Sequence, residues 1–248
     1  MFGKLMKYDI KALGKIIFPL WGALLILGFI FSLGIRFDLT VASSIAVFSL
    51  IAIIGVIAAI FTIGIIIVIQ RFWKGLLKQE GYLMFTLPVS VRSLILSKLF
   101  SALLISFGTV VVIVLLGIEV MIISPANVFI FDYIKQIHIE MLQVKYAAFS
   151  IGYAVILILL AMIANIYHLY AAMTLGQLSN KNRFLFAFAS YIILAIIFSV
   201  VDYLMLNIIP DLSNLAGGTG SSIFKYILEI IAFHIVTETV LTRRLNLE

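Results

Sequence analysis

The histidines are the side chains of this sequence best suited to proton transfer or metal binding, and there are three of them: His138, His168 and His234. An intramembrane metalloprotease needs H-E-x-x-H on one helix, and a serine protease needs Gly-x-Ser with a distant histidine. The three histidines give neither spacing. We interpret His138 with Glu140 as a solvated pair, and His234 with Glu238, four residues apart, as an ion pair. The pattern therefore predicts neither an enzyme nor a metal site.

Thiol and nucleotide chemistry are disfavoured as well. The sequence contains no cysteine, so no disulfide, thiolate metal site or cysteine nucleophile can form. No G-x-x-x-x-G-K-[ST] motif occurs, and the nearest glycine cluster, Gly217 to Ser222, contains no lysine. We interpret this cluster as a flexible loop, and we expect the chain to bind no nucleotide or other cofactor itself.

Polar side chains within apolar segments are the remaining candidates for function. Asn165 and His168 are three residues apart, which places them on one helical face, and Asp202, Asn207 and Glu229 lie in later segments. Ionisable groups at membrane depth are costly and tend to face a cavity or a partner. The alternative is that they form interhelical hydrogen bonds that fix packing. We expect packing for the two asparagines, and both roles stay open for Asp202 and Glu229.

The composition indicates that a membrane must position these residues. Hydrophobic residues make up 64% and charged residues 11% of the 248 residues, and the mean hydropathy is +1.25. Soluble domains have roughly 45 to 50% apolar and about 25% charged residues. The sequence therefore predicts an integral membrane protein. The net charge of +6 does not indicate a nucleic-acid partner, because in such a protein the positions of the charges carry the information.

Six apolar segments are each long enough to span a bilayer, which takes about 20 residues. Backbone groups in hydrocarbon must be paired internally, and the alternation of a barrel strand is not seen. We therefore predict an all-α integral membrane fold with six transmembrane helices. Their expected ranges are 16–35, 41–70, 94–123, 147–178, 184–209 and 222–242.

The residues before the first span predict an interfacial amphipathic helix over 1–15. Four lysines fall within one arc of about 80° on a helical wheel, opposite most of the apolar residues. Asp9 lies among the apolar positions and weakens the pattern, and Pro19 is expected to mark the bend into the first span. A secretory signal ending at Ser32–Gly34 is the alternative. The four lysines are Lys4, Lys7, Lys11 and Lys15.

The distribution of basic residues predicts the orientation. Thirteen of the 17 Lys and Arg residues lie on one side, namely twelve at the two termini or in the connections after the second and fourth spans and Lys98 at the start of the third span, and four lie on the other side. Cytosolic loops are the ones rich in Lys and Arg. Both termini, including the tail 243–248, are therefore expected in the cytosol.

Spans two and three are too long for a bilayer and meet in a cytosolic segment, 73–92. About 30 residues make about 45 Å of helix, whereas the hydrocarbon core is about 30 Å thick. Within the segment, Gly81 permits a break and Pro88 can begin a new helix. Apolar residues stranded outside the membrane usually mark an interface, although they could instead fold back on lipid headgroups. These residues are Tyr82, Leu83, Met84, Phe85 and Leu87.

The run Glu80–Val89, followed by Leu94–Lys98, closely resembles the cytosolic loop between spans two and three in ABC-2 type exporter permeases of Gram-positive bacteria. Leu175–Leu178 and Leu245–Leu247 are similar to that group as well, although only the first motif is specific. Among such permeases, those of exporters of amphipathic peptides, of the phenol-soluble modulin type, resemble this chain most.

The resemblance implies a half-transporter in the bacterial cytoplasmic membrane. Two permease copies pair, and each binds a cytosolic ATPase that holds ATP and Mg²⁺. The loop is then the coupling helix that docks on the ATPase, supported by the N-terminal helix. One departure is that Pro210–Ser221 leaves little room for the outer re-entrant helices of related exporters. The implied docking residues are Lys78, Glu80, Gly81, Tyr82, Leu83, Phe85, Thr86, Leu87 and Pro88.

The expected cargo is an amphipathic or hydrophobic substrate, because the spans carry few charges and the chain has 20 Phe and 10 Tyr. A toxin, antimicrobial or bacteriocin-like peptide fits this description. The alternative function is a membrane scaffold or immunity protein that sequesters a peptide without transporting it. A scaffold would have the same composition as a permease. Only the docking motif argues against this alternative.

Overall fold

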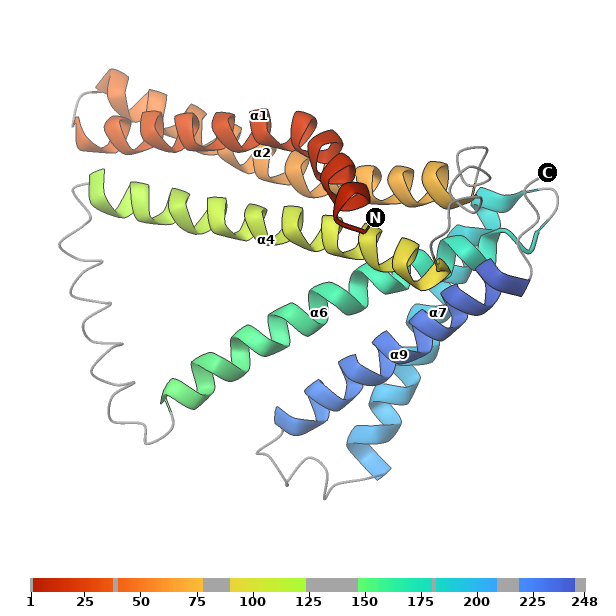
Figure 1. Cartoon of the computed structure of the whole chain (residues 1–248). Coiled ribbons are helices and arrows are strands. Elements are labelled where there is room, and N and C mark those ends of the chain that lie inside the picture. Colours follow the sequence, from red (N-terminus) through yellow and green to blue (C-terminus); the bar gives the residue numbers. More distant parts are fainter. Residues whose placement is uncertain are drawn as a thin grey trace. The chain divides into compact units, whose positions relative to one another are not determined.

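The computed structural model describes residues 2–37, 40–77, 90–123, 147–179, 182–208 and 219–243. Every regular element in these ranges is helical, so the predicted all-α fold is confirmed for this part of the chain (Figure 1). The elements are α1 (Phe2–Arg36), α2 (Thr40–Phe72), the π-helical turn η1 (Trp73–Leu77), α4 (Val91–Ile123), α6 (Ala147–Gly176), α7 (Arg183–Ile208) and α9 (Thr219–Arg243).

Five helices of the described residues are long and apolar enough to cross a membrane. They are Met6–Arg36, Ser44–Leu77, Val91–Ile123, Gly152–Gly176 and Arg183–Leu204. Helix α9 lies where the sixth span was predicted, but it is not in this group. Its apolar stretch is interrupted by Lys225, Glu229 and Glu238. The sixth span therefore stays a prediction.

The N-terminal residues and the first span form one continuous helix, α1. An interfacial helix was expected to end and a span to begin at residue 16. The structure has no break in the helix at this position. Pro19 lies inside α1, at the start of the predicted span 16–35. A proline removes one backbone hydrogen bond, and here the helix continues on both sides of it.

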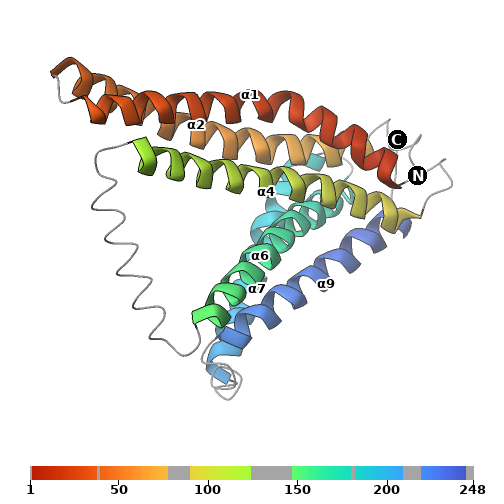
Figure 2. The same cartoon turned by 60° about the vertical axis from the view of Figure 1, so that its left-hand side comes forward.

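The chain divides into two compact units, each described here by itself. Unit 2 comprises Ile10–Ile67 and Leu104–Ile151, and its parts of α1, α2 and α4 lie side by side (Figure 1; Figure 2). Buried aliphatic side chains form its core, including Leu24 of α1, Ile60 of α2 and Leu116 of α4. The Trp21 indole Nε1 donates a hydrogen bond to Thr109 Oγ1 at 3.2 Å, which links α1 to α4.

Unit 1 comprises Met1–Asp9, Val68–Leu103 and Gly152–Glu248. It holds α6, α7 and α9 together with the first turns of α1, the end of α2 with η1, and the start of α4. Its core is more aromatic than that of unit 2, with Phe72, Tyr167, Tyr170 and Phe233 all buried. Close van der Waals packing is a main favourable term between helices in a membrane. The ends of three membrane-length helices are therefore packed against the α6, α7 and α9 group.

The turn from α6 to α7 depends on a glycine. A Cβ at Gly176 would lie 2.6 Å from Ala187 Cβ and 2.7 Å from the Arg183 carbonyl oxygen, and a backbone carbonyl cannot move aside. We expect Gly176→Ala to lower the free energy of unfolding by about 1–3 kcal/mol through overpacking. Thermal unfolding in detergent measures this. Gly152→Ala is the control, because nothing lies within 4 Å of its Cβ position; equal midpoints for the two variants would contradict the prediction.

Candidate functional site

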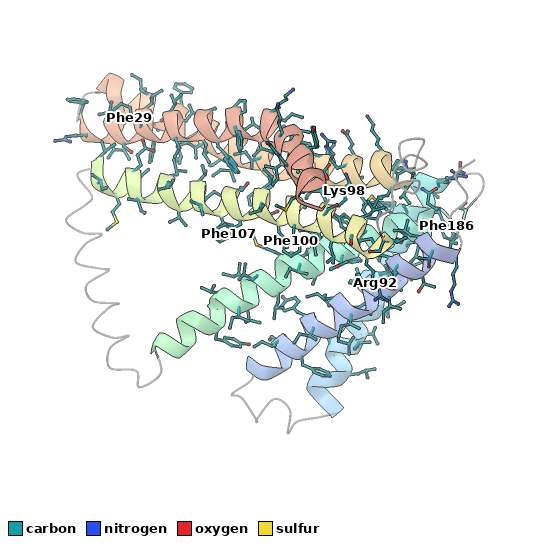
Figure 3. The ribbon with its side chains drawn as sticks, in the orientation of Figure 1. Phe29, Arg92, Lys98, Phe100, Phe107 and Phe186 are labelled. Carbon is teal, nitrogen blue, oxygen red and sulfur yellow. The ribbon has the colours of Figure 1, made fainter. Side chains whose placement is uncertain are left out.

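A buried carboxylate on the first turns of α1 organises one end of unit 1. Lys98 of α4 donates from Nζ to both oxygens of Asp9, at 2.8 Å each. The side chains of Lys98 and Asp9 are only 6% and 7% exposed. Arg71, near the end of α2, places Nη1 3.7 Å from Asp9 Oδ1. We call Asp9, Arg71 and Lys98 the ion triad. Figure 3 labels Lys98 where α4 passes the first turns of α1.

The two cations of the ion triad have different roles. Lys98 is enclosed and satisfies both oxygens of Asp9, so it provides the compensation that a buried carboxylate requires. Arg71 is 39% exposed and farther away, so solvent screens its attraction to Asp9. Removing either member of the Asp9–Lys98 pair would therefore leave a buried charge without its close partner, and Arg71 adds a further positive charge to the triad.

The π-helical turn η1 begins two residues after Arg71 along the chain. Its Gly75 lies under the Lys98 side chain, since a Cβ at this position would be 3.3 Å from Lys98 Nζ. Leu76 and Leu77 are 0% and 2% exposed within the core of unit 1. A π-helical turn takes one more residue than an α-helical turn and is frequently found at functional sites.

Aromatic contacts fix the same end of α2 to two other helices. Phe72 stacks on Tyr170 of α6, with ring centroids 4.1 Å apart and an interplanar angle of 16°. Trp73 meets the edge of Phe184 of α7 at 6.5 Å. Such pairs add to the stabilisation that burial alone gives. The α2 side of the segment 78–89 is therefore anchored to α6, α7, α1 and α4.

The α4 side of that segment is anchored too. Ser90 Oγ accepts a hydrogen bond from the Ser93 backbone N–H at 3.3 Å, as in an N-cap. Arg92 donates from Nε to Glu238 of α9, and Figure 3 labels Arg92 on the first turn of α4. His234 Nε2 lies 3.7 Å from Glu238, in the geometry expected for an ion pair if the ring is protonated. Its Nδ1 lies 3.1 Å from the hydroxyl of Tyr167.

The structure does not bring Asn165 and His168 together in one site. The Asn165 amide donates to the Ala161 carbonyl of its own helix at 2.8 Å, and the residue is exposed. His168 is stacked between Tyr191 and Phe233, at centroid distances of 4.2 and 4.9 Å. The interhelical packing role expected for Asn165 is therefore not shown, whereas His168 does pack between α7 and α9.

Asp202 forms an ion pair that the sequence analysis did not predict. Lys225 of α9 donates from Nζ to Asp202 Oδ2 of α7 at 2.7 Å, and the two side chains are 29% and 35% exposed. Glu229 lies one helical turn after Lys225, on the same side of α9. Asn207 is within α7, and its side chain lies outside the described residues. Asp202 thus joins two helices, which favours the packing role.

The predicted lysine stripe is exposed where it is described. Lys7, Lys11 and Lys15 are all exposed, and the side chain of Lys4 lies outside the described residues. Leu13 and Ile17, on the opposite side of α1, are 4% and 1% exposed. The described lysines and these two buried side chains thus lie on different sides of α1, and an interfacial helix over 1–15 stays a prediction.

All of the predicted docking residues lie outside the described residues, because the structure describes nothing between Leu77 and Ser90. This applies to Lys78, Glu80, Gly81, Tyr82, Leu83, Phe85, Thr86, Leu87 and Pro88. Within the described ranges, no group of three or more His, Cys, Asp or Glu side chains could hold a metal ion.

Sequence reasoning missed the ion triad. Its signal was present, since Asp9 is an acid on the apolar side of an amphipathic helix, where only a buried partner makes a carboxylate tolerable. Comparisons of the chain with protein-family models, with curated proteins and with solved structures found no match.

Proposed function

We propose that this chain is the membrane-spanning permease subunit of an ABC-2 type exporter. One observation carries the proposal: the two helix ends that flank residues 78–89, whose sequence resembles a docking loop, are both fixed in the core of unit 1. On one side Phe72, Leu76 and Leu77 are buried, and on the other Lys98 pairs with Asp9. A segment that receives force from a partner needs a rigid base of this kind.

The contacts of this base suggest how force would spread. Movement of the segment 78–89 would pass into α2 through the packed aromatic residues Phe72 and Trp73, and into α4. From α4, the Lys98–Asp9 pair leads to α1 and the Arg92–Glu238 pair leads to α9. Closure of ATP-loaded partner subunits would then rock the helices between inward-facing and outward-facing states.

The rest of the proposed assembly is based on the sequence resemblance and on the distribution of basic residues. In the proposed assembly, α9 is the sixth span, both termini are cytosolic, and two permease copies pair in the bacterial cytoplasmic membrane. The Asp202–Lys225 pair supports a membrane location for α9, because it compensates two of the charges that this helix and α7 would carry into the bilayer. ATP and Mg²⁺ belong to the partner ATPase, whose docking residues on this chain are Glu80–Pro88.

The substrate class is tested by efflux. We expect bacterial cells that contain this chain and its ATPase to export a fluorescently labelled amphipathic peptide, since the described spans are apolar and rich in exposed aromatic residues. Replacing the catalytic carboxylate of the ATPase by an amide should reduce efflux to the level of cells without the permease. Efflux that is equal with the active and inactive ATPase would contradict the proposal and would favour the sequestering scaffold.

A further inference from the structure

The residues of the π-helical turn η1 can be compared with an α-helical turn of the same sequence, which has one residue fewer per turn. Residues before Trp73 follow the α-helical pattern from Thr40 onward, and η1 adds one residue to the last turn. One extra residue rotates everything that follows it by about 100°, the angle that one residue takes in an α-helix. The sequence Trp73–Leu77 contains no proline, so its backbone can form either kind of turn.

Contacts around η1 favour the π-helical turn over an α-helical turn. A side chain at position 75 would crowd Lys98, because its Cβ would lie 3.3 Å from Nζ and 3.4 Å from Cε of Lys98. Lys98 cannot swing away freely, since both oxygens of Asp9 hold its ammonium group at 2.8 Å. Rewinding the turn to the α register would move Gly75 from its place beside Lys98.

We propose that Asp9 is a positioning residue that acts through Lys98 to hold η1 in its π register. A change from the π to the α register would alter the direction in which the chain continues after Leu77. This inference rests on the proposed function for its purpose, because a docking segment on a turn with two registers can respond to its partner. The register itself concerns this chain alone and is measured without any partner.

The absence of cysteine from the sequence makes the register measurable by thiol labelling. In the described register Lys74 is exposed, whereas Leu77 is 2% exposed. The single-cysteine variants Leu77→Cys and Lys74→Cys are expressed as the full chain in membranes and treated with a water-soluble maleimide. Each is then combined with Asp9→Asn, which removes the charge that holds Lys98, and with Asp9→Glu, which keeps a carboxylate.

The proposal predicts a change at one position only. With Asp9→Asn, labelling at Leu77→Cys should become faster by about tenfold, because in an α-helical turn position 77 lies on the same face as the exposed position 74, three residues before it. Labelling at Lys74→Cys, near the start of the turn, should keep its rate. Asp9→Glu should restore the rate at Leu77→Cys toward its original value. Gly75→Ala, which crowds Lys98 while Asp9 is intact, should produce the same result and replaces Asp9→Asn if that variant is not expressed.

Two results would overturn the proposal. Faster labelling at both positions would show local unfolding of the α2 end rather than a change of register. Unchanged rates at both positions in Asp9→Asn and Gly75→Ala would show that neither Asp9 nor the space over Gly75 holds the turn. Because the assay contains no ATPase and no peptide, either result leaves the exporter proposal to be judged by efflux.

Discussion

Lys98→Ala is expected to lower the free energy of unfolding by about 3–5 kcal/mol, because it leaves the buried carboxylate of Asp9 without its partner. Lys98 donates both close hydrogen bonds to Asp9, and the side chains are 6% and 7% exposed. Arg71, at 3.7 Å and 39% exposed, offsets a part of this loss and moves the expected value toward the lower end. The unfolding midpoint of the purified chain in detergent measures the effect.

Lys74→Ala is the matched control for this prediction. It removes the same charge from the same end of unit 1, but Lys74 is exposed, so the change in stability should stay within about 0.5 kcal/mol. The double variant Asp9→Ala with Lys98→Ala should be destabilised by less than the sum of the two single variants, since no unpaired charge remains. Equal midpoints for Lys98→Ala and Lys74→Ala would mean that the ion pair contributes nothing to the fold.

The helices of this protein could be predicted well from the sequence because the signal is local. A long apolar run must bury or satisfy its own backbone groups, and only a helix does so within one segment. The predicted span 147–178 corresponds to α6 (Ala147–Gly176), and 184–209 corresponds to α7 (Arg183–Ile208). The N-terminal boundary was harder to place, since a proline such as Pro19 can end a helix or lie inside one.

The ion triad could not be predicted in the same way, because its members are far apart along the chain. Asp9 and Lys98 are separated by 89 residues. From sequence, Lys98 counted only as one of many basic residues near the cytosolic side, and Asp9 as an exception to an amphipathic pattern. Only packing of α1 against α4 shows that the two charges compensate each other. The contact beside the π-helical turn was equally hidden, since it joins Gly75 of η1 to Lys98 of α4, a separate helix.

The spacing of residues along a helix predicts which of them share a face, but it does not predict which residues of other helices they contact. Asn165 and His168 are three residues apart, as expected for one side of α6. Their environments nevertheless differ, because Asn165 bonds to its own helix while His168 stacks on Tyr191 and Phe233. The face of a helix is a property of the sequence, whereas the neighbours of that face are a property of the whole fold.

The second large effect concerns the proposed docking segment, 78–89. If the chain is the proposed permease, replacing Tyr82, Leu83 and Phe85 together by aspartate is expected to weaken its complex with the partner ATPase by more than about 4 kcal/mol, a thousandfold loss of affinity. Aromatic and aliphatic anchors at the centre of an interface contribute most of the binding free energy. Three carboxylates in an apolar groove would each lose hydration without gaining a partner.

A conservative triple variant is the control, with Tyr82→Phe, Leu83→Met and Phe85→Leu. It keeps apolar side chains of similar size at all three positions, so it should bind the ATPase nearly as well as the original chain. Both variants should elute as monodisperse protein when expressed without the ATPase. This separates loss of docking from loss of the fold.

Copurification of the affinity-tagged chain with the ATPase from solubilised membranes tests the central claim most directly. The proposed function predicts that the ATPase elutes with the original chain and with the conservative variant, and is absent from the eluate of the aspartate variant. An ATPase that remains bound to the aspartate variant in equal amount would show that the segment 78–89 is not where the energy-supplying partner docks.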